Sequence, residues 1–371
     1  MMRPARRALS QVGGPVRRWG DAGWSARLAE ALAVDAPRDV PLPHVHGFHA
    51  YPGRMHPETA RRLVREAPRG GTVLDPFCGG GTVLVEALLE GRAAIGLDIN
   101  PLAVRLATLR TTRVGARERR ALIELAARTG ERARAIGYAP APSAAEAEWF
   151  APHVLRELAA LRAALSELQR TDKAFLELVL SSILIKMSRQ SSDSSLAKLD
   201  KRHAPGFASR LFVRKTEELA GRLAELEALV PRHAPRVEVL RGDARELRGI
   251  ADASVDLVVT SPPYGGVYDY AAFQARRSAW LGFESALNQA GSQEIGQRSR
   301  AGRGFVRELS EVLRSLRRVL RAGHPALLVL GDGTAPATPT LERALTGSGL
   351  RLLASASQRR LRGEEHIFAL L

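Results

Sequence analysis

The segment Thr260-Ser261-Pro262-Pro263-Tyr264 combines groups that can bind a planar ring bearing an exocyclic amine. Its two prolines have no N–H to donate and fix φ, so the turn is stiff and presents bare carbonyl acceptors. The Ser261 hydroxyl can accept a further hydrogen bond, and the Tyr264 ring offers a flat face for stacking. Such a turn predicts recognition of an amino-substituted ring. A Pro-Pro turn that only closes a strand is the alternative.

A second segment suited to ligand binding is the glycine-rich turn within residues 72–82, TVLDPFCGGGT. Glycine has no Cβ, so the backbone of such a turn can approach a ligand closely. Leu84 stands where the dinucleotide fingerprint has its third glycine, and the Gly-Lys-Ser/Thr of a phosphate loop is absent. Kinase or ATPase chemistry therefore fits this turn poorly.

Asp98 follows the glycine-rich turn by roughly 20 residues, the distance at which nucleotide-binding sheets bind ribose hydroxyls. In the sequence Asp98-Ile99-Asn100-Pro101, Asp98 could also cap the helix that begins at Pro101. The two roles do not exclude each other, and we predict Asp98 as a ribose ligand.

These residues must be positioned by strands that end directly before them. Residues 72–75, 93–98 and 255–259 are apolar runs bounded by turn residues, which predicts buried strands, and a helical pattern follows at 83–89. Ligands of open α/β sheets bind at the carboxyl ends of the strands. Both turns must therefore lie at the same edge of one sheet if they act together.

The remaining elements complete an α/β pattern. We expect strands at 237–240 and 326–330, a helix at 305–320, and a closing antiparallel pair at 350–353 and 366–371. Residues 115–235 show the helical periodicity of amphipathic packing. The prediction is a mostly parallel sheet with helices on both faces, split by a helical insertion. Its parts are a basic N-terminal tail (1–40), a first half (41–114), the insertion (115–235) and a second half (236–371).

Composition restricts the class of protein. The chain has 371 residues, of which 45% are hydrophobic and 25% charged, as in ordinary globular proteins. No apolar run approaches the roughly 20 residues of a membrane helix, and the arginine-rich start lacks the apolar core of a secretory signal. The formal charge of +16 favours a polyanionic partner. The single cysteine, Cys78, excludes an internal disulfide and fits a reducing cytoplasm, which is the location we expect.

Two further segments invite functional interpretations. Residues 44–57 contain four histidines, but their spacing matches no metal signature and we predict no metal site. Residues 186–203 are polar, rich in serine and interspersed with basic side chains. They form either a solvated linker or a loop that contacts phosphates and base edges. Cys78 lacks an evident activating base, so we do not expect it to be a nucleophile.

Together these segments resemble the motifs of S-adenosylmethionine-dependent amino-methyltransferases that act on adenine N6 or cytosine N4. TSPPY resembles motif IV, (D/N/S)PPY, and DPFCGGGT at 75–82 resembles the motif I that cradles the cofactor. Residues 44–57, followed by a helix at 57–65, resemble motif X. The order of motifs resembles that of the permuted class, in which target recognition lies between the motifs. The resemblance implies a Rossmann-like methyltransferase fold.

The resemblance also implies S-adenosylmethionine as cofactor and assigns roles to individual residues. In the catalytic turn, Ser261 and the carbonyl of Pro262 would accept the two amine hydrogens, with Pro263 completing the turn and Tyr264 stacking on a flipped base. A glycine-hinged loop at 265–270 would lie over that base. Asp243 would lie near the adenine amino group of the cofactor. The implied cofactor-binding residues are Phe48, His49, Asp75, Phe77, Gly79, Gly81, Thr82, Asp98, Asn100 and Asp243.

The target base follows from the first position of motif IV. SPPY resembles the cytosine-N4 enzymes more than the DPPY adenine enzymes, so we expect site-specific methylation of cytosine N4 in DNA, as in restriction–modification. Methylation at cytosine C5 is excluded, because it requires a cysteine nucleophile and the only cysteine lies in the cofactor turn. Adenine N6 in DNA and guanine N2 in RNA remain open. So does a nucleic-acid-binding protein that keeps the fold without catalysis.

Overall fold

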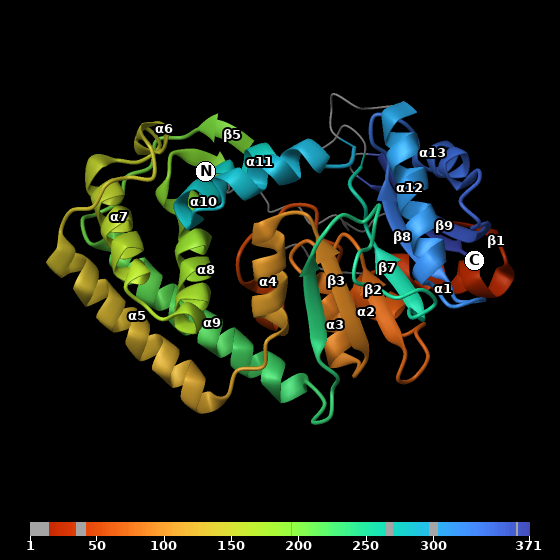
Figure 1. The fold of residues 1–371 in the computed structure, drawn as a ribbon, viewed down its shortest axis with the longest axis horizontal. Coiled ribbons are helices and arrows are strands. Elements are labelled where there is room, and N and C mark those ends of the chain that lie inside the picture. The colour runs from red at the N-terminus through yellow and green to blue at the C-terminus, as the bar shows by residue number, and fades with distance from the viewer. Residues whose placement is uncertain (1–14, 35–41, 194, 265–269, 297–302, 361–362) are drawn as a thin grey trace.

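The computed structural model describes residues 15–34, 42–193, 195–264, 270–296, 303–360 and 363–371. In these residues an eight-stranded sheet forms the centre of the molecule, in the order β1-β9-β10-β8-β7-β2-β3-β6 (Figure 1). The strands are β1 (Val16–Gly20), β2 (Thr72–Asp75), β3 (Ala93–Asp98), β6 (Val237–Arg241), β7 (Leu257–Thr260), β8 (Ala326–Gly331), β9 (Leu352–Arg360) and β10 (Gly363–Leu370).

The strand order of the sheet reverses between β2 and β7. From β2 the chain proceeds to β3 and then β6 on one side, whereas β7 and β8 lie on the other side. Strand β2 is parallel to both of its neighbours, and Val73 pairs with Leu257 and Leu74 with Val258. In open α/β sheets a ligand cleft is expected at such a switch point, beyond the carboxyl ends of the strands.

Helices cover both faces of the sheet because its strands are buried on both sides. On one face, α1 (Ala22–Leu32), α2 (Pro57–Val64) and α3 (Thr82–Leu89) pack in the same cluster as Val73 of β2. On the other face, α12 (Arg303–Val319) and α13 (Ala337–Leu345) pack with Leu74. Successive strand residues therefore face opposite layers. The predicted Rossmann-like fold is confirmed.

The helical insertion leaves the sheet after α4 (Pro101–Thr111) and returns at β6. It contains α5 (Ala116–Ile136), α6 (Ala144–Ala147), α7 (Pro152–Ser166), α8 (Arg170–Met187), the hairpin β4 (Gln190–Ser192) and β5 (Ser195–Lys198), and α9 (Phe207–Leu229). Its helices gather on the left of Figure 1, beside the sheet. Apolar residues of α4, α7, α8, α9 and α10 share one core, so the insertion is packed against the sheet domain.

Two helices connect the end of β7 with α12. Helix α10 (Tyr270–Leu281) packs against α8 of the insertion, and α11 (Glu284–Gln293) continues from it. In Figure 1 they lie across the top of the molecule. Within the part of the chain that the structure describes, no helix is long and apolar enough to cross a membrane.

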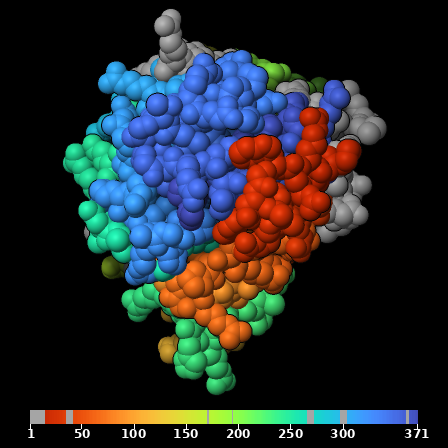
Figure 2. Space-filling model, turned by 90° about the vertical axis from the view of Figure 1, so that its right-hand side faces the viewer, coloured from red at the N-terminus to blue at the C-terminus, as the bar shows by residue number. Residues whose placement is uncertain are grey.

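The N-terminal prediction needs correction. Residues 16–32, expected within a basic tail, form β1 and α1, and β1 extends the sheet by pairing with β9. Helix α1 buries Leu28 and Leu32, one turn apart, against the sheet. Figure 2 shows this segment lying against the C-terminal part of the chain. The apolar positions Trp24, Leu28 and Leu32 are compatible with one short helix in the sequence, whereas strand β1 was not expected.

The closing antiparallel pair was predicted in kind but not in length. β9 and β10 pair antiparallel, but β9 runs from Leu352 to Arg360 instead of ending at residue 353. Its inward positions include Ala354 and Ala356, which are fully buried. Alanines alternating with serines give a weaker strand pattern than β-branched residues, so the sequence did not indicate the full strand.

Candidate active-site cleft

The glycine-rich turn and the Pro-Pro turn lie side by side at the carboxyl ends of β2 and β7. Thr260 Oγ1 donates a hydrogen bond of 2.7 Å to Asp75 Oδ1, which also accepts from the backbone N–H of Phe77 at 3.1 Å. Asp75 and Thr260 are only 4% and 1% exposed. The hydrogen bond therefore links the last residues of two parallel strands inside the protein. Both turns lie at one edge of the sheet, as the sequence required.

A cleft opens at this edge. Seven of the predicted residues line it, together with residues that the sequence did not single out. The predicted lining residues are Phe77, Gly79, Asp98, Asn100, Asp243, Ser261 and Pro263. Tyr51, Pro52 and Gly53 contribute from the segment before α2, Leu287 and Ala290 from α11, and Ile295 from just beyond its end. The spacing of Leu287 and Ala290 is that of ordinary helix packing, so no sequence signal distinguished them.

Asp98 is held in a defined orientation on the cleft wall. Its Oδ2 accepts from the Gly79 N–H at 2.9 Å and its Oδ1 from the Asn100 N–H at 2.8 Å. The side chain of Asn100, rather than that of Asp98, caps α4 by accepting from the Leu102 N–H at 2.9 Å. Desolvation by burial raises the pKa of Asp98 to about 6, although both N–H groups favour the ionised form.

The glycines of the turn have different roles. Gly79 has a φ of +49° and lines the cleft. Gly81 has a φ of +80° and precedes α3, and a Cβ placed there would lie 2.9 Å from Ala107 Cα of α4. Gly81 therefore permits close packing of α3 on α4. Thr82 and Asp75 line a smaller cavity, which Ser261 and Gly79 also line. Burial raises the pKa of the adjacent Cys78 thiol, which disfavours a nucleophilic thiolate.

The pKa of Asp75 gives the first testable prediction. Burial raises this pKa from its usual range to about 7. The folded state therefore binds a proton that the unfolded state releases above pH 4. The associated stability is present at low pH and is lost as pH rises to about 7. Replacing Asp75 by Asn removes this titration. Between pH 5 and pH 8, the unfolding free energy of the variant relative to wild type should rise by about 3 kcal/mol.

Urea unfolding of both proteins at the two pH values measures this change. Asp200→Asn, at an exposed carboxylate, serves as the control and should show no comparable shift. A constant difference between Asp75→Asn and wild type at both pH values would mean that Asp75 is ionised throughout.

Phe48 and His49 lie in the protein interior and are not among the described residues that line the cleft. Phe48 packs in the core shared with the insertion. The ring of His49 contacts Ser181 Oγ of α8 at 2.9 Å and the Ala50 carbonyl at 2.9 Å. Tyr51, three residues after Phe48, reaches the cleft instead. The segment before α2 therefore reaches the cleft through the residues just beyond the predicted pair.

Tyr264 and Pro262 are also not among the described residues that line the cleft. The Tyr264 ring packs beside Gly331 at the end of β8, where an added Cβ would lie 2.6 Å from ring atom Cε2. It lines a separate, smaller pocket with Phe305 and Leu330. Pro262 is buried. The glycine-hinged loop that the sequence placed over a target base falls, at 265–269, outside the described residues.

Asp243 lines the cleft but is already engaged by a neighbour. Arg245 Nε donates to both of its carboxylate oxygens at 3.0 Å, and the backbone N–H of Arg245 donates to Oδ1 at 2.9 Å. The carboxylate is thus fixed at the start of the turn after β6. Arg245 Nη2 also donates to Oδ2 at 2.5 Å, so four hydrogen bonds from Arg245 already occupy the roughly four lone-pair sites of this carboxylate.

The structure brings together one group of metal-type ligands within its described residues. Atoms of His44, His46 and Glu86 lie within 4.8 Å of one another. His46 Nε2 contacts Glu86 Oε1 at 2.6 Å, and Arg61 Nε donates to Glu86 Oε2 at 2.8 Å. Arg54 lies close by and donates to the His46 carbonyl. The guanidinium of Arg61 already balances the carboxylate, and a further cation would be repelled, so this is a buried polar contact.

Parts of the chain are similar to known nucleic-acid methyltransferases. Residues 34–109 match the family model described as DNA methylase (N6_N4_Mtase). The chain is 31% identical over 121 residues to the Type II methyltransferase M.MjaII of Methanocaldococcus jannaschii, covering 31% of this chain and 23% of that protein. It is 38% identical over 71 residues to the Type II methyltransferase M.MvaI of Kocuria varians, covering 18% and 16%.

A third relative acts on RNA by its name. Over 60 residues the chain is 45% identical to the tRNA (guanine(10)-N2)-dimethyltransferase of Methanothermobacter thermautotrophicus, covering 16% of this chain and 18% of that protein. Each of these matches spans less than a quarter of the relative's length. The family-model match includes β2, the glycine-rich turn and Asp98, which form one wall of the cleft. Together the matches support an amino-methyltransferase.

Proposed function

We propose that this chain transfers a methyl group from S-adenosylmethionine to an exocyclic amine of a nucleic-acid base, namely cytosine N4 in DNA. The observation that carries the proposal is the Thr260–Asp75 hydrogen bond. It fixes the turn that would hold the cofactor beside the turn that would hold the amine. Ser261 and Gly79, one from each turn, line the same cleft.

The chemistry of the cleft fits this cofactor. Asp98 offers a fixed carboxylate to ribose hydroxyls, and Asp243, held by Arg245, would lie near the adenine amino group. Ile99, Leu287 and Ile295 supply apolar surface for a purine ring. S-adenosylmethionine, when bound, supplies an electrophilic methyl group on a positively charged sulfur.

The Pro-Pro turn would prepare the amine. The nitrogen of an aromatic amine is a weak nucleophile because its lone pair is delocalised into the ring. The Ser261 hydroxyl and the Pro262 carbonyl would accept its two hydrogens, which favours tetrahedral geometry and exposes the lone pair. No covalent enzyme intermediate is needed. The rate enhancement would come from positioning and from fixed dipoles.

The choice of cytosine N4 in DNA as the target rests on two features. The DNA methylase model matches the chain, and serine occupies the first position of the SPPY turn. RNA guanine N2 is the second candidate, because the tRNA methyltransferase shares the highest identity of the three relatives compared, over its short match. Adenine N6 in DNA differs from the leading proposal only in the target ring. A catalytically inactive nucleic-acid-binding protein is the non-enzymatic alternative.

One experiment separates these functions. The purified protein is incubated with methyl-labelled S-adenosylmethionine and a mixture of DNA and RNA, and labelled nucleosides are identified after digestion. Labelled 4-methylcytosine from DNA is the expected product. Labelled 6-methyladenine, or labelled guanosine from RNA, would replace the proposal with the corresponding alternative. Absence of label, with calorimetry showing that the cofactor does not bind, would favour the inactive binding protein.

Replacing Tyr264 by alanine tests how the target base is held. We expect the KM for nucleic acid to rise about tenfold, because stacking of a base on an aromatic ring contributes about 1–3 kcal/mol. The cofactor dissociation constant should not change, since the ring does not line the cofactor cleft. We expect the ring to contact the target base because Tyr264 directly follows Pro263 in the turn that would hold the base.

The two constants are measured by steady-state kinetics and by calorimetry. Tyr264→Phe keeps the ring and its packing beside Gly331, and so should behave like wild type. An equal loss of cofactor and nucleic-acid binding in Tyr264→Ala would assign the ring to packing alone.

A further inference from the structure

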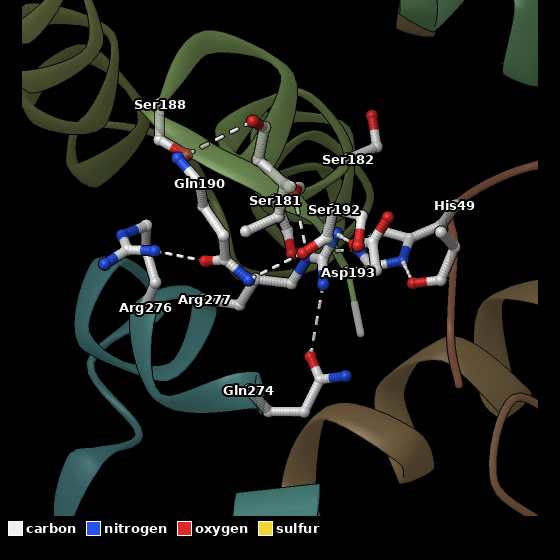
Figure 3. A network of polar contacts seen from close by, with 12 residues as sticks. His49, Ser181, Ser182, Ser188, Gln190, Ser192, Asp193, Gln274, Arg276 and Arg277 are labelled. Atoms are coloured by element: carbon white, nitrogen blue, oxygen red, sulfur yellow. Dashed lines mark hydrogen bonds and ion pairs between the residues drawn. The ribbon is translucent and has the colours of Figure 1, made fainter. Parts of the chain in front are cut away.

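The short hairpin β4–β5 of the insertion is fastened to α10 by buried polar side chains. Arg277 of α10 pairs with Asp193 in the hairpin turn, and Arg276 pairs with Gln190 of β4. These two arginines are only 1% and 6% exposed. Arg277 Nε also donates to the Ser181 carbonyl of α8 at 3.3 Å. Figure 3 shows how these side chains from α8, α10 and the hairpin point toward one another.

The rest of the hairpin base is fixed as well. Lys201 Nζ donates to the Ile185 carbonyl at 2.8 Å, and the Gln190 side chain donates to the Ser192 carbonyl at 2.8 Å. Buried polar side chains that are hydrogen-bonded to one another stabilise a single conformation. The hairpin therefore projects from a rigid base, and the segment 186–203 is not a solvated linker.

The outer side of this hairpin is exposed and basic. Leu196 and Leu199 are 48% and 54% exposed, so they present apolar surface to a partner beside the basic side chains. In the described residues of 186–202, four basic side chains are exposed, against one exposed acidic side chain, Asp200. The one other acid, Asp193, is engaged by Arg277. The exposed cations are Lys186, Arg189, Lys198 and Arg202.

The hairpin is linked to the cleft through the helices α10 and α11. Helix α10, which holds it, begins at Tyr270, shortly after the Pro-Pro turn, and leads into α11, whose residues line the cleft. In Figure 1, β5, α10 and α11 all lie along the top of the molecule, at the edge where α4 begins after β3. A long partner bound at the cleft would therefore also meet the hairpin.

We propose that the β4–β5 hairpin binds the major groove of duplex DNA next to the target base. The inference rests on the proposed function and specifies how its substrate is held. A two-stranded ribbon fits the major groove, where serine hydroxyls can contact base edges and apolar side chains can contact thymine methyl groups. Arg189, Lys198 and Arg202 contact the flanking phosphates. Ser191, on the face of the hairpin opposite the buried Gln190, and the exposed Leu196 face the bases.

The test compares two triple variants in DNA binding. Arg189→Ala, Lys198→Ala and Arg202→Ala together remove three hairpin cations. Three exposed arginines of α5, Arg117, Arg120 and Arg128, are replaced by alanine in the matched control. Binding of a labelled DNA duplex is followed by fluorescence anisotropy at several salt concentrations, and cofactor binding by calorimetry.

The hairpin variant should bind the duplex at least about tenfold more weakly. Its slope of log affinity against log salt should fall by about 2.7, since each phosphate contact contributes about 0.9. The control variant and the cofactor dissociation constants of both should match wild type. A hairpin variant that binds DNA like wild type, or a control that loses as much, overturns the inference.

Two further measurements keep this inference separate from the proposed function. A hairpin variant that loses affinity for duplex RNA but not for duplex DNA also overturns the inference. If wild-type protein methylates cytosine in DNA and the hairpin variant does so with unchanged KM, only the hairpin proposal fails. If wild-type protein labels no nucleic acid, the proposed function fails, and the DNA-binding comparison still tests the hairpin.

Discussion

Replacing Ser261 by alanine should lower the rate constant of methyl transfer by about 100- to 1,000-fold, the usual effect of removing one preorganised polar group at a reacting centre. Ser261 follows directly after Thr260, which is fixed to Asp75, and it lines the cleft beside Gly79 and Phe77. Its hydroxyl would accept an amine hydrogen as the nitrogen becomes tetrahedral. The interaction strengthens as the reaction proceeds, so its loss should appear in kcat and not in cofactor binding.

Single-turnover kinetics with labelled cofactor measure this rate constant, and calorimetry measures cofactor binding. The matched variant is Ser261→Asn, which restores a neutral acceptor and should retain more activity than Ser261→Ala. If Ser261→Ala transferred methyl groups at the wild-type rate, the hydroxyl would have no part in activating the amine. If both variants lost cofactor binding equally, Ser261 would be a structural residue of the cleft wall.

Replacing Asp98 by alanine should raise the cofactor dissociation constant by about 10- to 100-fold. The carboxylate is held by the N–H groups of Gly79 and Asn100 and has further lone pairs for the ribose hydroxyls. Hydrogen bonds to a charged acceptor contribute about 1.5–3 kcal/mol, which corresponds to this range. Loss of the anchor for two backbone N–H groups adds to the effect, because those donors would remain partly buried.

The pH dependence of cofactor binding distinguishes a ribose ligand from a residue that only shapes the turn. The pKa of Asp98 in the free protein is raised to about 6, so below that pH the carboxyl is protonated and must lose its proton to accept both hydroxyls. Affinity should therefore fall by up to about tenfold per pH unit below pH 6 and level off above pH 7.

The Asp98→Asn variant should bind weakly and show a flatter profile over the same range, which calorimetry at several pH values can measure. An Asp98→Ala variant that binds the cofactor as tightly as wild type would remove Asp98 from the ribose site.

Features of the site that depend on local turn chemistry could be predicted from sequence. The end of β2, the glycine turn, the end of β3 and the Pro-Pro turn are each recognisable within a few residues, because turn residues mark the points at which strands stop. The adjacency of the two turns could only be stated as a requirement. It depends on which strands pair, and the pairing of Val73 with Leu257 joins segments separated by the entire insertion.

Side-chain direction and distant contributions could not be predicted in this way. Tyr264 packs beside Gly331, a glycine of the next strand along the sheet, so the direction of its ring depends on packing that no local pattern records. Helix α11 lines the cleft through Leu287 and Ala290, residue types that usually indicate only a packed helix face. Arg277 is buried by partners from α8 and the hairpin, whereas an arginine in sequence suggests solvent exposure.

In the proposed function, one cleft would hold the cofactor against Asp98, with its reacting sulfur directed at the Pro-Pro turn. A crystal structure of the protein with S-adenosylhomocysteine tests it most directly. The expected result is that both ribose hydroxyls bind Asp98, while the sulfur faces Ser261 and the Pro262 carbonyl across the cleft. A ligand bound away from Asp98, or one whose sulfur points away from residues 261–263, would contradict the account.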